Sequence, residues 1–549
     1  MIAEPIGAGM LLFANQGSRR SLLSSERLAS ACVALAYLAW CMAVQIFSGS
    51  WHAAFLAYPD EPSHFVGAAM IRDWLVSGPW FAPLGFATNY YEHYPYFAVG
   101  YWPPLFSVVT GFWMLLTGVG RTQALLIPAV FAAGSGWLLF QFVRRRMGMV
   151  AGICAGAVYL SLPAVQQWMC AVMVDHMTAF LCLAAAAALI RYLKNPILWN
   201  GVLCGAVCGC AVLSKYSAAY IVALPLATIV LTRRFGLLRK PSFLVQPLLI
   251  AVMVGPWALW TRGLARYGLP SEREALTAGR VGSFLLETFK IFPPVLLAIV
   301  ILGLIAAVVM ARPWRDDLIV LALLGAGHLS FLILSPVGAE HRYLMVPAAV
   351  LLVAAFVGGS GLLAWAVRGG DQNTVLATGM AVATLLFAVF EFSHMVRFPP
   401  DRIARVVALI VKDPARSGQR ILVPPTLEGA VIADFVAQRR DRTYSLVRPI
   451  KKLASGDWFG GHYSSKFENC EQMMEYFRQE PVDLIMWDAS PESTLRPHAR
   501  ILGEMLRRYP LTWVKVPSSD PVDGPQSLIT LYDYRAEAGR DRNKPTYLK

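Results

Sequence analysis

The stretch WPPLFSVVTGFWMLLTGVG, residues 102–120, decides how this chain is threaded through a membrane. It is apolar and close to the roughly 20 residues that a membrane-spanning helix needs. Only one further apolar block separates it from the arginine-rich segment RRRMG at 144–148. Whether residues 102–120 span the membrane therefore determines on which side these arginines and every later connector lie.

The composition indicates a polytopic membrane protein. Of the 549 residues, 56% are apolar and 15% are charged, whereas soluble domains are near 45–50% apolar and about 25% charged. The excess is spread over about eleven apolar blocks that we interpret as membrane spans. They cover roughly 30–48, 123–143, 148–163, 177–193, 199–213, 217–232, 243–261, 291–311, 317–335, 344–366 and 374–392.

The net charge of +14 lies mostly in short connectors between these blocks. Such a distribution follows the positive-inside rule, by which basic loops stay cytoplasmic, and no nucleic-acid partner is expected. The basic connectors follow every second block. They are RRRMG (144–148), RYLKNP (191–196), RRFGLLRK (233–240), ARPWRDD (311–317) and VRGGDQN (367–373), and they share the predicted cytoplasmic side with SRR (18–20).

Counting residues 102–120 as a span would move Arg144 outside and reverse every later connector. We therefore interpret this stretch as an interfacial or re-entrant helix on the outer face. It begins at Pro103 and Pro104, because proline is tolerated in a first helical turn. The expected fold is mainly α, a polytopic bundle of about eleven spans with outer-face juxtamembrane helices.

Residues 49–122 then form one long outer loop, which contains FLAYPDEPSHF at 55–65. Its adjacent carboxylates, Asp60 and Glu61, face outside. The same orientation brings other charges to this face, namely Asp175, Lys215 and those of GAEHRYLMVP (338–347). Charges at membrane depth are costly and by default mark a functional site. The sequence thus predicts one extracytoplasmic pocket where distant side chains meet.

The start of this loop reads as an amphipathic helix lying on lipid. Its apolar face would contain Phe65, Ala69, Trp74 and Leu75, and its polar face His64, Arg72 and Asp73. The aromatic residues that follow suit either the headgroup level or the wall of a site for a sugar or lipid-tailed ligand. They are Trp80, Phe81, Tyr90, Tyr91, Tyr94, Tyr96, Phe97, Tyr101 and Trp102.

The C-terminal tail, after Glu391, has a different composition, in which charged residues and prolines are mixed with short apolar runs. Strands are predicted at 420–425, 443–449, 482–488, 512–516 and 527–534, with helical patterns at 428–440, 469–479 and 495–509 between them. This alternation predicts a small α/β domain. We expect three parts: a cytoplasmic N-terminal segment (1–28), a transmembrane domain (29–395) and a soluble extracytoplasmic α/β domain (396–549).

The chain resembles the GT-C class of polytopic glycosyltransferases, in particular the protein O-mannosyltransferases and lipid A aminoarabinose transferases. The resemblance covers roughly residues 30–365. YPDEPSHF is similar to the acidic motif of the family's first outer loop, and VMVDHMTAF to a second acidic motif. YWPPLFSVVTGFWMLLTG looks like the (K/H)PPL motif, with Trp102 in place of Lys or His. LSKYSAAY resembles a TKG-like motif in which Lys215 matches and Tyr216 departs, and EHRYLMVPAAVLL looks like the RYLLP motif.

This resemblance implies an integral-membrane enzyme of the cytoplasmic (inner) membrane that uses a polyprenyl-phosphate sugar. Asp60 would be the general base for an acceptor hydroxyl, because a positioned carboxylate can take that proton. Single displacement would invert the anomeric centre, and fixed cations would stabilise the departing phosphate. With the residues that the motifs indicate and their charged neighbours, the candidate catalytic residues are Asp60, Glu61 and Asp175, and the candidate substrate-binding residues are Lys215, Arg342, Tyr343, His64, Glu92, His93 and Trp102.

Two other functions and one question of composition stay open. One of the functions is that of a non-catalytic assembly subunit whose tail binds a partner. A transporter or lipid flippase would also gather charges in a bundle, but it should show inverted repeats, and none is evident. The open question of composition is a divalent cation, with Glu61, Asp175, Glu92 and His93 as candidate ligands, although their spacing defines no metal motif. The sequence does not distinguish a glycan, a lipid or a protein as the acceptor.

Overall fold

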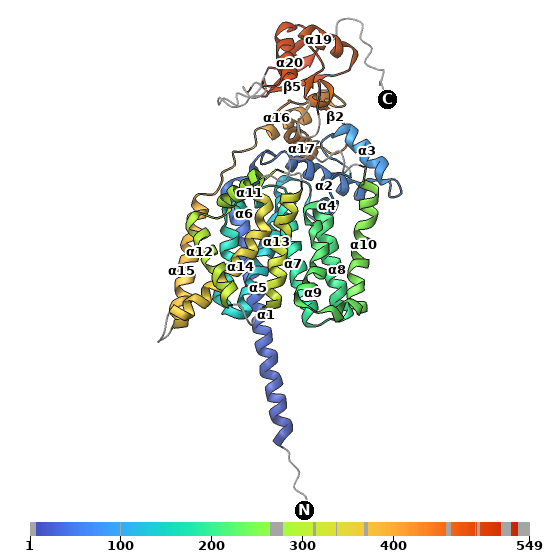
Figure 1. The fold of residues 1–549 in the computed structure, drawn as a ribbon. Coiled ribbons are helices and arrows are strands. Elements are labelled where there is room, and N and C mark those ends of the chain that lie inside the picture. The colour runs from blue at the N-terminus through green and yellow to red at the C-terminus, as the bar shows by residue number, and fades with distance from the viewer. Residues whose placement is uncertain are drawn as a thin grey trace, which may run out of the picture.

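The computed structural model describes residues 7–98, 100–263, 278–310, 315–335, 338–366, 372–456, 463–488, 490, 495–517 and 529–535. Its helices form a bundle, and a smaller domain with a β-sheet lies at one end of that bundle (Figure 1). The predicted architecture, a mainly helical membrane protein with a C-terminal α/β domain, is confirmed.

The bundle helices follow the predicted apolar blocks. They are α1 (Gly7–Ser48), α5 (Arg121–Ser161), α7 (Asp175–Lys194), α8 (Leu198–Ser214), α9 (Leu224–Thr232), α10 (Pro241–Thr261), α11 (Ala278–Ile291), α12 (Pro294–Met310), α13 (Arg315–Leu334), α14 (Met345–Ala366) and α15 (Gln372–Ser393). Within the described ranges, seven helices are long and apolar enough to span a membrane, or eight if the pair Val281–Ile291 and Pro294–Ile305, bent by 110°, is one span. The expected number of about eleven spans stays a prediction.

Helix α5 contains two of the predicted spans. Its backbone leaves the helical conformation at Gly148, with φ 83° and ψ 179°, a left-handed φ that glycine adopts without steric cost. The two halves pack against each other: Gly152 faces Phe140, and a Cβ at Gly156 would lie 2.5 Å from the Gly136 carbonyl oxygen. The basic segment 144–148 therefore forms the turn of a helical hairpin.

Basic connectors meet at the end of the bundle away from the C-terminal domain. Lys194 Nζ lies 2.9 Å from Asp317 Oδ2, and Arg234 pairs with Asp316. These contacts join the connectors 191–196 and 233–240 to the start of α13. The segments 311–314 and 367–371 lie outside the described residues. The clustering agrees with the pattern expected for one membrane face, and the cytoplasmic orientation stays a prediction.

The decisive stretch forms helix α4 (Leu105–Thr117), directly after Pro103 and Pro104. At 1.5 Å per residue it measures about 20 Å, less than the roughly 30 Å thickness of a hydrocarbon core. It packs on α2 (Asp60–Ser77), where Gly111 approaches the Ala68 carbonyl. α3 (Pro83–His93) and α6 (Pro163–Met169) also lie at the end of the bundle that meets the C-terminal domain (Figure 1). The short η1 (Ser50–His52) follows α1 and contacts α5.

The prediction that α2 lies on lipid with a polar face toward water is wrong. Phe65 and Ala69 are fully buried. His64 and Asp73, which were expected to be exposed, are also almost fully buried. The reason is that α4 packs on one side of α2 and the C-terminal domain packs on another. A one-sided amphipathic pattern does not reveal that a helix is covered from both sides.

The C-terminal domain contains a five-stranded sheet in the order β2-β1-β5-β7-β6. β1 (Arg420–Leu422) pairs in parallel with β2 (Ser445–Val447) and β5 (Leu484–Asp488), whereas β7 (Ile529–Tyr534) is antiparallel to β5 and β6 (Trp513–Lys515). All five strands fall within the predicted segments. The other elements are α16 (Ile403–Lys412), η7 (Pro414–Arg416), α17 (Glu428–Gln438), α18 (Pro449–Lys452), β3 (Ala454–Ser455), β4 (Ser464–Ser465), α19 (Cys470–Gln479) and α20 (Pro497–Arg508).

One hydrophobic core extends from the juxtamembrane helices into this domain. Phe65 and Phe86 belong to the same buried cluster as Ile421, Val431 and Phe435. The domain boundaries stay a prediction, and apolar contacts cross the one expected at residue 396. The C-terminal domain is thereby seated directly on α2, the helix that begins with Asp60.

Candidate active site

A cavity of about 1380 Å³ lies where the bundle meets the C-terminal domain. Its volume exceeds the 300–1,000 Å³ that is typical of a site for one small ligand. Side chains of α2, α10, α13 and α18 line it, together with η2 (Tyr216–Ala223) and η6 (His341–Leu344). Its charged lining residues are Asp60, Lys215, Arg262, Glu340, Arg342, Arg448 and Lys451.

Asp60 lies in the first turn of α2, with 19% of its side chain exposed. A carboxylate is favoured at that end of a helix because the peptide dipoles place positive charge there. Its Oδ2 is 3.8 Å from Arg342 Nη2. Burial raises the pKa of Asp60 to about 6, against the opposing influence of Arg342 and Lys215. A carboxyl group with a pKa near neutrality suits a general base.

Arg342 connects the acidic groups of the site. Its side chain is buried, its Nε lies 2.7 Å from Glu340 Oε2, and its Nη1 lies 4.0 Å from Asp175 Oδ2. The guanidinium carbon is 3.9 Å from the centre of the Tyr58 ring and 5.3 Å from that of Trp168. Cation–π contacts of this kind hold the planar cation in place.

Asp175 and Lys215 form the second ion pair of the site. Asp175 is the first residue of α7, Lys215 directly follows α8, and Lys215 Nζ donates to Asp175 Oδ1 at 2.6 Å. The ammonium group also lies 4.4 Å from the centre of the Tyr343 ring. The structure thus brings together four charged residues from four separate motifs, Asp60, Asp175, Lys215 and Arg342.

Glu61 is turned away from the cavity, contrary to the catalytic position expected for it. Its carboxylate is fully buried and pairs with Arg121 Nη2 at 2.5 Å. It also accepts hydrogen bonds from the backbone N–H groups of Ala57 and Val172, at 3.1 and 3.0 Å. Glu61 therefore ties the segment before Asp60 to the segment before Asp175, which is a positioning role.

Glu61→Gln is expected to destabilise the protein by about 3–5 kcal/mol, because it leaves the buried Arg121 guanidinium without a carboxylate. Thermal unfolding in detergent measures this loss. Glu475→Gln, on an exposed helix face, is the matched control and should leave the unfolding temperature unchanged. A Glu61→Gln protein with wild-type stability but no activity would contradict the positioning role and restore the catalytic one.

His64, Trp102 and Tyr343 take different positions. His64 is buried against the rings of Trp102 and Phe106, and this burial lowers its pKa to about 3, so the imidazole is neutral. Trp102 lines the cavity at the place where the family motif has a cation. Tyr343 also lines it, and its hydroxyl accepts a hydrogen bond from Arg342 at 2.9 Å.

Glu92 and His93 do not reach the cavity. Both belong to the last turn of α3: His93 contacts the Asn89 carbonyl, and the Glu92 carbonyl accepts a hydrogen bond from Ser445 of the C-terminal domain. The candidate metal ligands are therefore not brought together. Within the described ranges, no group of three or more His, Cys, Asp or Glu side chains is arranged to hold a metal ion.

Sequence reasoning missed three kinds of residue at this site. Glu340 precedes Arg342 by two positions, and this spacing is the one local signal that could have identified it. Tyr58, which stacks on Arg342, carried no charge to mark it. Arg448 and Lys451 come from the tail, which lay outside the resemblance, and only the docking of the C-terminal domain places them at the cavity.

Comparisons with known proteins bear on the fold and on the family of one segment. Residues 101–260 match the family model of the dolichyl-phosphate-mannose-protein mannosyltransferases. No curated protein sequence matches the chain significantly. The solved structure of ArnT from Cupriavidus metallidurans in the apo state is similar, with a TM-score of 0.57 and 17% identity over 91% of this chain and 97% of that one.

Two further structures share the fold. ArnT from the same organism bound to undecaprenyl phosphate gives a TM-score of 0.55 at 16% identity, over 91% of this chain and 97% of that one. The second is the archaeal oligosaccharyltransferase AglB from Archaeoglobus fulgidus, in complex with an inhibitory peptide and a dolichol-phosphate. Its TM-score is 0.51 at 13% identity, and the match covers 91% of this chain and 75% of AglB. This chain therefore shares its fold with ArnT and AglB, and residues 101–260 carry its similarity to the dolichyl-phosphate-mannose-protein mannosyltransferases.

Proposed function

We propose that this enzyme transfers one monosaccharide from a polyprenyl-phosphate donor to a glycan, lipid or protein acceptor on the outer face of the cytoplasmic membrane. The observation that carries the proposal is Asp60, a carboxyl group of raised pKa on the wall of a large cavity, beside the buried Arg342. The donor class is supported by the similar structures, which were solved with undecaprenyl phosphate and with a dolichol-phosphate.

In the proposed reaction, Asp60 accepts the proton of the acceptor hydroxyl as that oxygen bonds to the anomeric carbon. The bond between this carbon and the phosphate oxygen breaks, and the phosphate leaves with the electron pair. Since the leaving group is already an anion of low basicity, a general acid is not essential. One displacement from the face opposite the phosphate inverts the anomeric centre, as in inverting glycosidases.

The departing phosphate requires positive charge that the protein holds in place. Lys215 and Arg342 supply it at the base of the cavity, but both already share their charge with carboxylates. Arg262 and Lys451 also line the cavity, and neither has a carboxylate partner among the described residues. We assign the phosphate to this set of cations, with Lys215 and Arg342 nearest to Asp60.

The outer-face assignment is supported by charge placement. The paired connectors around Lys194 and Arg234 lie at the far end of the bundle from the cavity. By the positive-inside rule that end is cytoplasmic. The cavity and the C-terminal domain would then be extracytoplasmic, where polyprenyl-linked donors and envelope acceptors meet.

The purified chain in detergent is expected to consume one polyprenyl-phosphate sugar from a labelled panel and to release polyprenyl phosphate in equal amount. Thin-layer chromatography follows the donor, and NMR of the product compares its anomeric configuration with that of the donor. Nucleotide sugars serve as the control donors and should not be consumed. Use of a nucleotide sugar would contradict the donor class, and retained anomeric configuration would contradict single displacement.

A further inference from the structure

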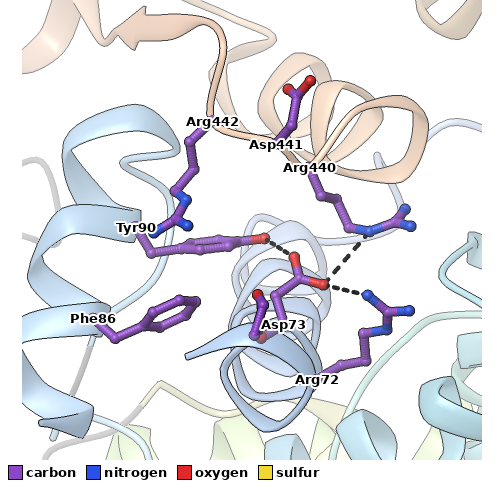
Figure 2. A pocket seen from close by; sticks show the side chains of 8 residues that line it. Arg72, Asp73, Phe86, Tyr90, Arg440, Asp441 and Arg442 are labelled. Atoms are coloured by element: carbon purple, nitrogen blue, oxygen red, sulfur yellow. Dashed lines mark hydrogen bonds and ion pairs between the residues drawn. The ribbon is translucent and has the colours of Figure 1, made fainter. Parts of the chain in front are cut away.

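A second, smaller cavity lies apart from the proposed active site, between the juxtamembrane helices and the C-terminal domain. Its volume is about 270 Å³. Helix α2 contributes Arg72, Asp73 and Ser77, helix α3 contributes Phe86 and Tyr90, and the segment after α17 contributes Arg440, Asp441 and Arg442 (Figure 2). Three arginines thus meet in a space that the proposed reaction does not use.

Asp73 lies at the centre of this cluster. Its Oδ1 is 2.8 Å from Arg72 Nη1 and 3.6 Å from Arg440 Nε, and its Oδ2 accepts a hydrogen bond from the Tyr90 hydroxyl at 3.4 Å (Figure 2). Asp441 contributes little to neutralising the three arginines, because its carboxylate pairs with Arg439, which does not line the cavity. Arg72 and Arg440 therefore share one buried carboxylate, and Arg442 has no carboxylate partner among the described residues.

Part of the hydrogen-bonding capacity of these arginines is unused. The buried Nε of Arg72 makes no hydrogen bond to a described residue, and the Nε of Arg440 faces Asp73 Oδ1 at 3.6 Å, beyond hydrogen-bond distance. Arg440 Nη1 donates to the carbonyls of Val436 and Ala437, at 3.4 and 3.2 Å. Arg442 donates through Nη1 to Asn89 Oδ1 at 2.8 Å, and its guanidinium carbon stacks 5.0 Å from the Phe86 ring centre. Partly buried cations that lack acceptors are costly, and guanidinium groups are well matched to phosphate oxygens.

An apolar edge borders the cavity. Between Ser77 and Phe86, Phe81 is fully exposed and Trp80 is largely exposed. Val76 and Leu84, which flank these two residues, are exposed as well. Exposed tryptophan and other aromatic side chains settle at the headgroup level of a bilayer. Helices α2 and α3 lie where the bundle ends and the C-terminal domain begins (Figure 1), which is the level at which lipid headgroups would be found.

We propose that this cavity binds the phosphate of an anionic phospholipid headgroup, whose acyl chains lie along the edge formed by Val76, Trp80, Phe81 and Leu84. Arg440 and Arg442 contact the phosphate from the C-terminal domain, and Arg72 contacts it from α2. The bound lipid therefore joins the domain to the helix that begins with Asp60. This binding site is independent of the proposed sugar transfer and of the donor cavity.

The full chain in detergent is titrated with phosphatidylglycerol, and native mass spectrometry measures the bound lipid. The double variant Arg440→Gln/Arg442→Gln is expected to bind phosphatidylglycerol at least about tenfold more weakly, since each charged hydrogen bond contributes strongly. The double variant Arg402→Gln/Arg405→Gln removes the same two positive charges from exposed positions at the start of α16 and should bind as the wild type does. Equal affinity in the double variant and the wild type would overturn the proposal.

Asp73→Asn keeps the proposal testable if the arginine variants fail to fold. It removes the anion that competes with a phosphate for Arg72 and Arg440, so lipid affinity should rise. Unchanged affinity would mean that the cluster is a structural ion-pair network only.

Inorganic phosphate and phosphatidylcholine are tested as two further ligands. Stabilisation against heat by free phosphate as strong as that by phosphatidylglycerol would reject a lipid as the ligand, and equal binding of phosphatidylcholine would reject the need for an anionic headgroup.

Discussion

Asp60→Asn is expected to lower the rate of sugar transfer by about 10²- to 10⁴-fold, which is the usual contribution of a general base. The substitution preserves the shape of the side chain and its place in the first turn of α2. It removes the ability to accept a proton from the acceptor hydroxyl. Donor binding should change little, so the loss should be seen in kcat for the consumption of the labelled polyprenyl-phosphate sugar.

A matched control is available in the same chain. The Asp317 side chain is also 19% exposed and also pairs with a cation, Lys194, but at the opposite end of the bundle. Asp317→Asn makes the same chemical change away from the cavity and should transfer sugar at the wild-type rate. If Asp60→Asn were as active as Asp317→Asn, Asp60 could not be the base.

The pH dependence gives a second readout of the same group. Asp60 must be ionised to accept a proton, and burial raises its pKa to about 6. Transfer should therefore fall as the pH drops through about 6 and reach a plateau above it. The acidic limb should be absent from the residual activity of Asp60→Asn, because no carboxyl group then titrates at that position.

The sequence predicted the helical bundle and the strands of the tail because both depend on local pattern. The helix expected within residues 102–120 is present as α4, and its placement on the outer face, inferred from the charges of distant connectors, stays a prediction. Local pattern could not predict which way each side chain points. Neighbouring helical residues point about 100° apart, so Asp60 faces the cavity while Glu61 faces Arg121.

Other errors arose from packing between parts of the chain that are far apart in sequence. His64 is buried against Trp102 and Phe106 at α4, whereas Asp73 is buried where the C-terminal domain covers α2 and pairs with Arg440. No residue near either one in the sequence predicts this packing. The docking of the same domain brings Arg448 and Lys451 to the cavity that Asp60 lines. A residue's role at an interface between domains depends on the relative placement of two folds, which single-sequence patterns do not encode.

Arg342→Gln is the variant with the second large expected effect, a loss of about 10²- to 10³-fold in kcat, as for removal of one fixed group that stabilises transition-state charge. It also leaves Asp60, Asp175 and Glu340 without their shared cation. Since Arg342 lowers the pKa of Asp60, its removal should shift the acidic limb of the rate profile to higher pH.

Arg342→Lys separates charge from geometry. It keeps the positive charge, so the pH midpoint should stay near that of the wild type, but a lysine lacks the planar fork that holds several oxygens at once. An intermediate rate is therefore expected. Arg416→Gln, which breaks a comparable arginine pairing with two carboxylates in the C-terminal domain, is the control for general destabilisation. If Arg342→Gln slowed transfer without moving the pH midpoint, the guanidinium would act on the phosphate alone, and its electrostatic coupling to Asp60 would be refuted.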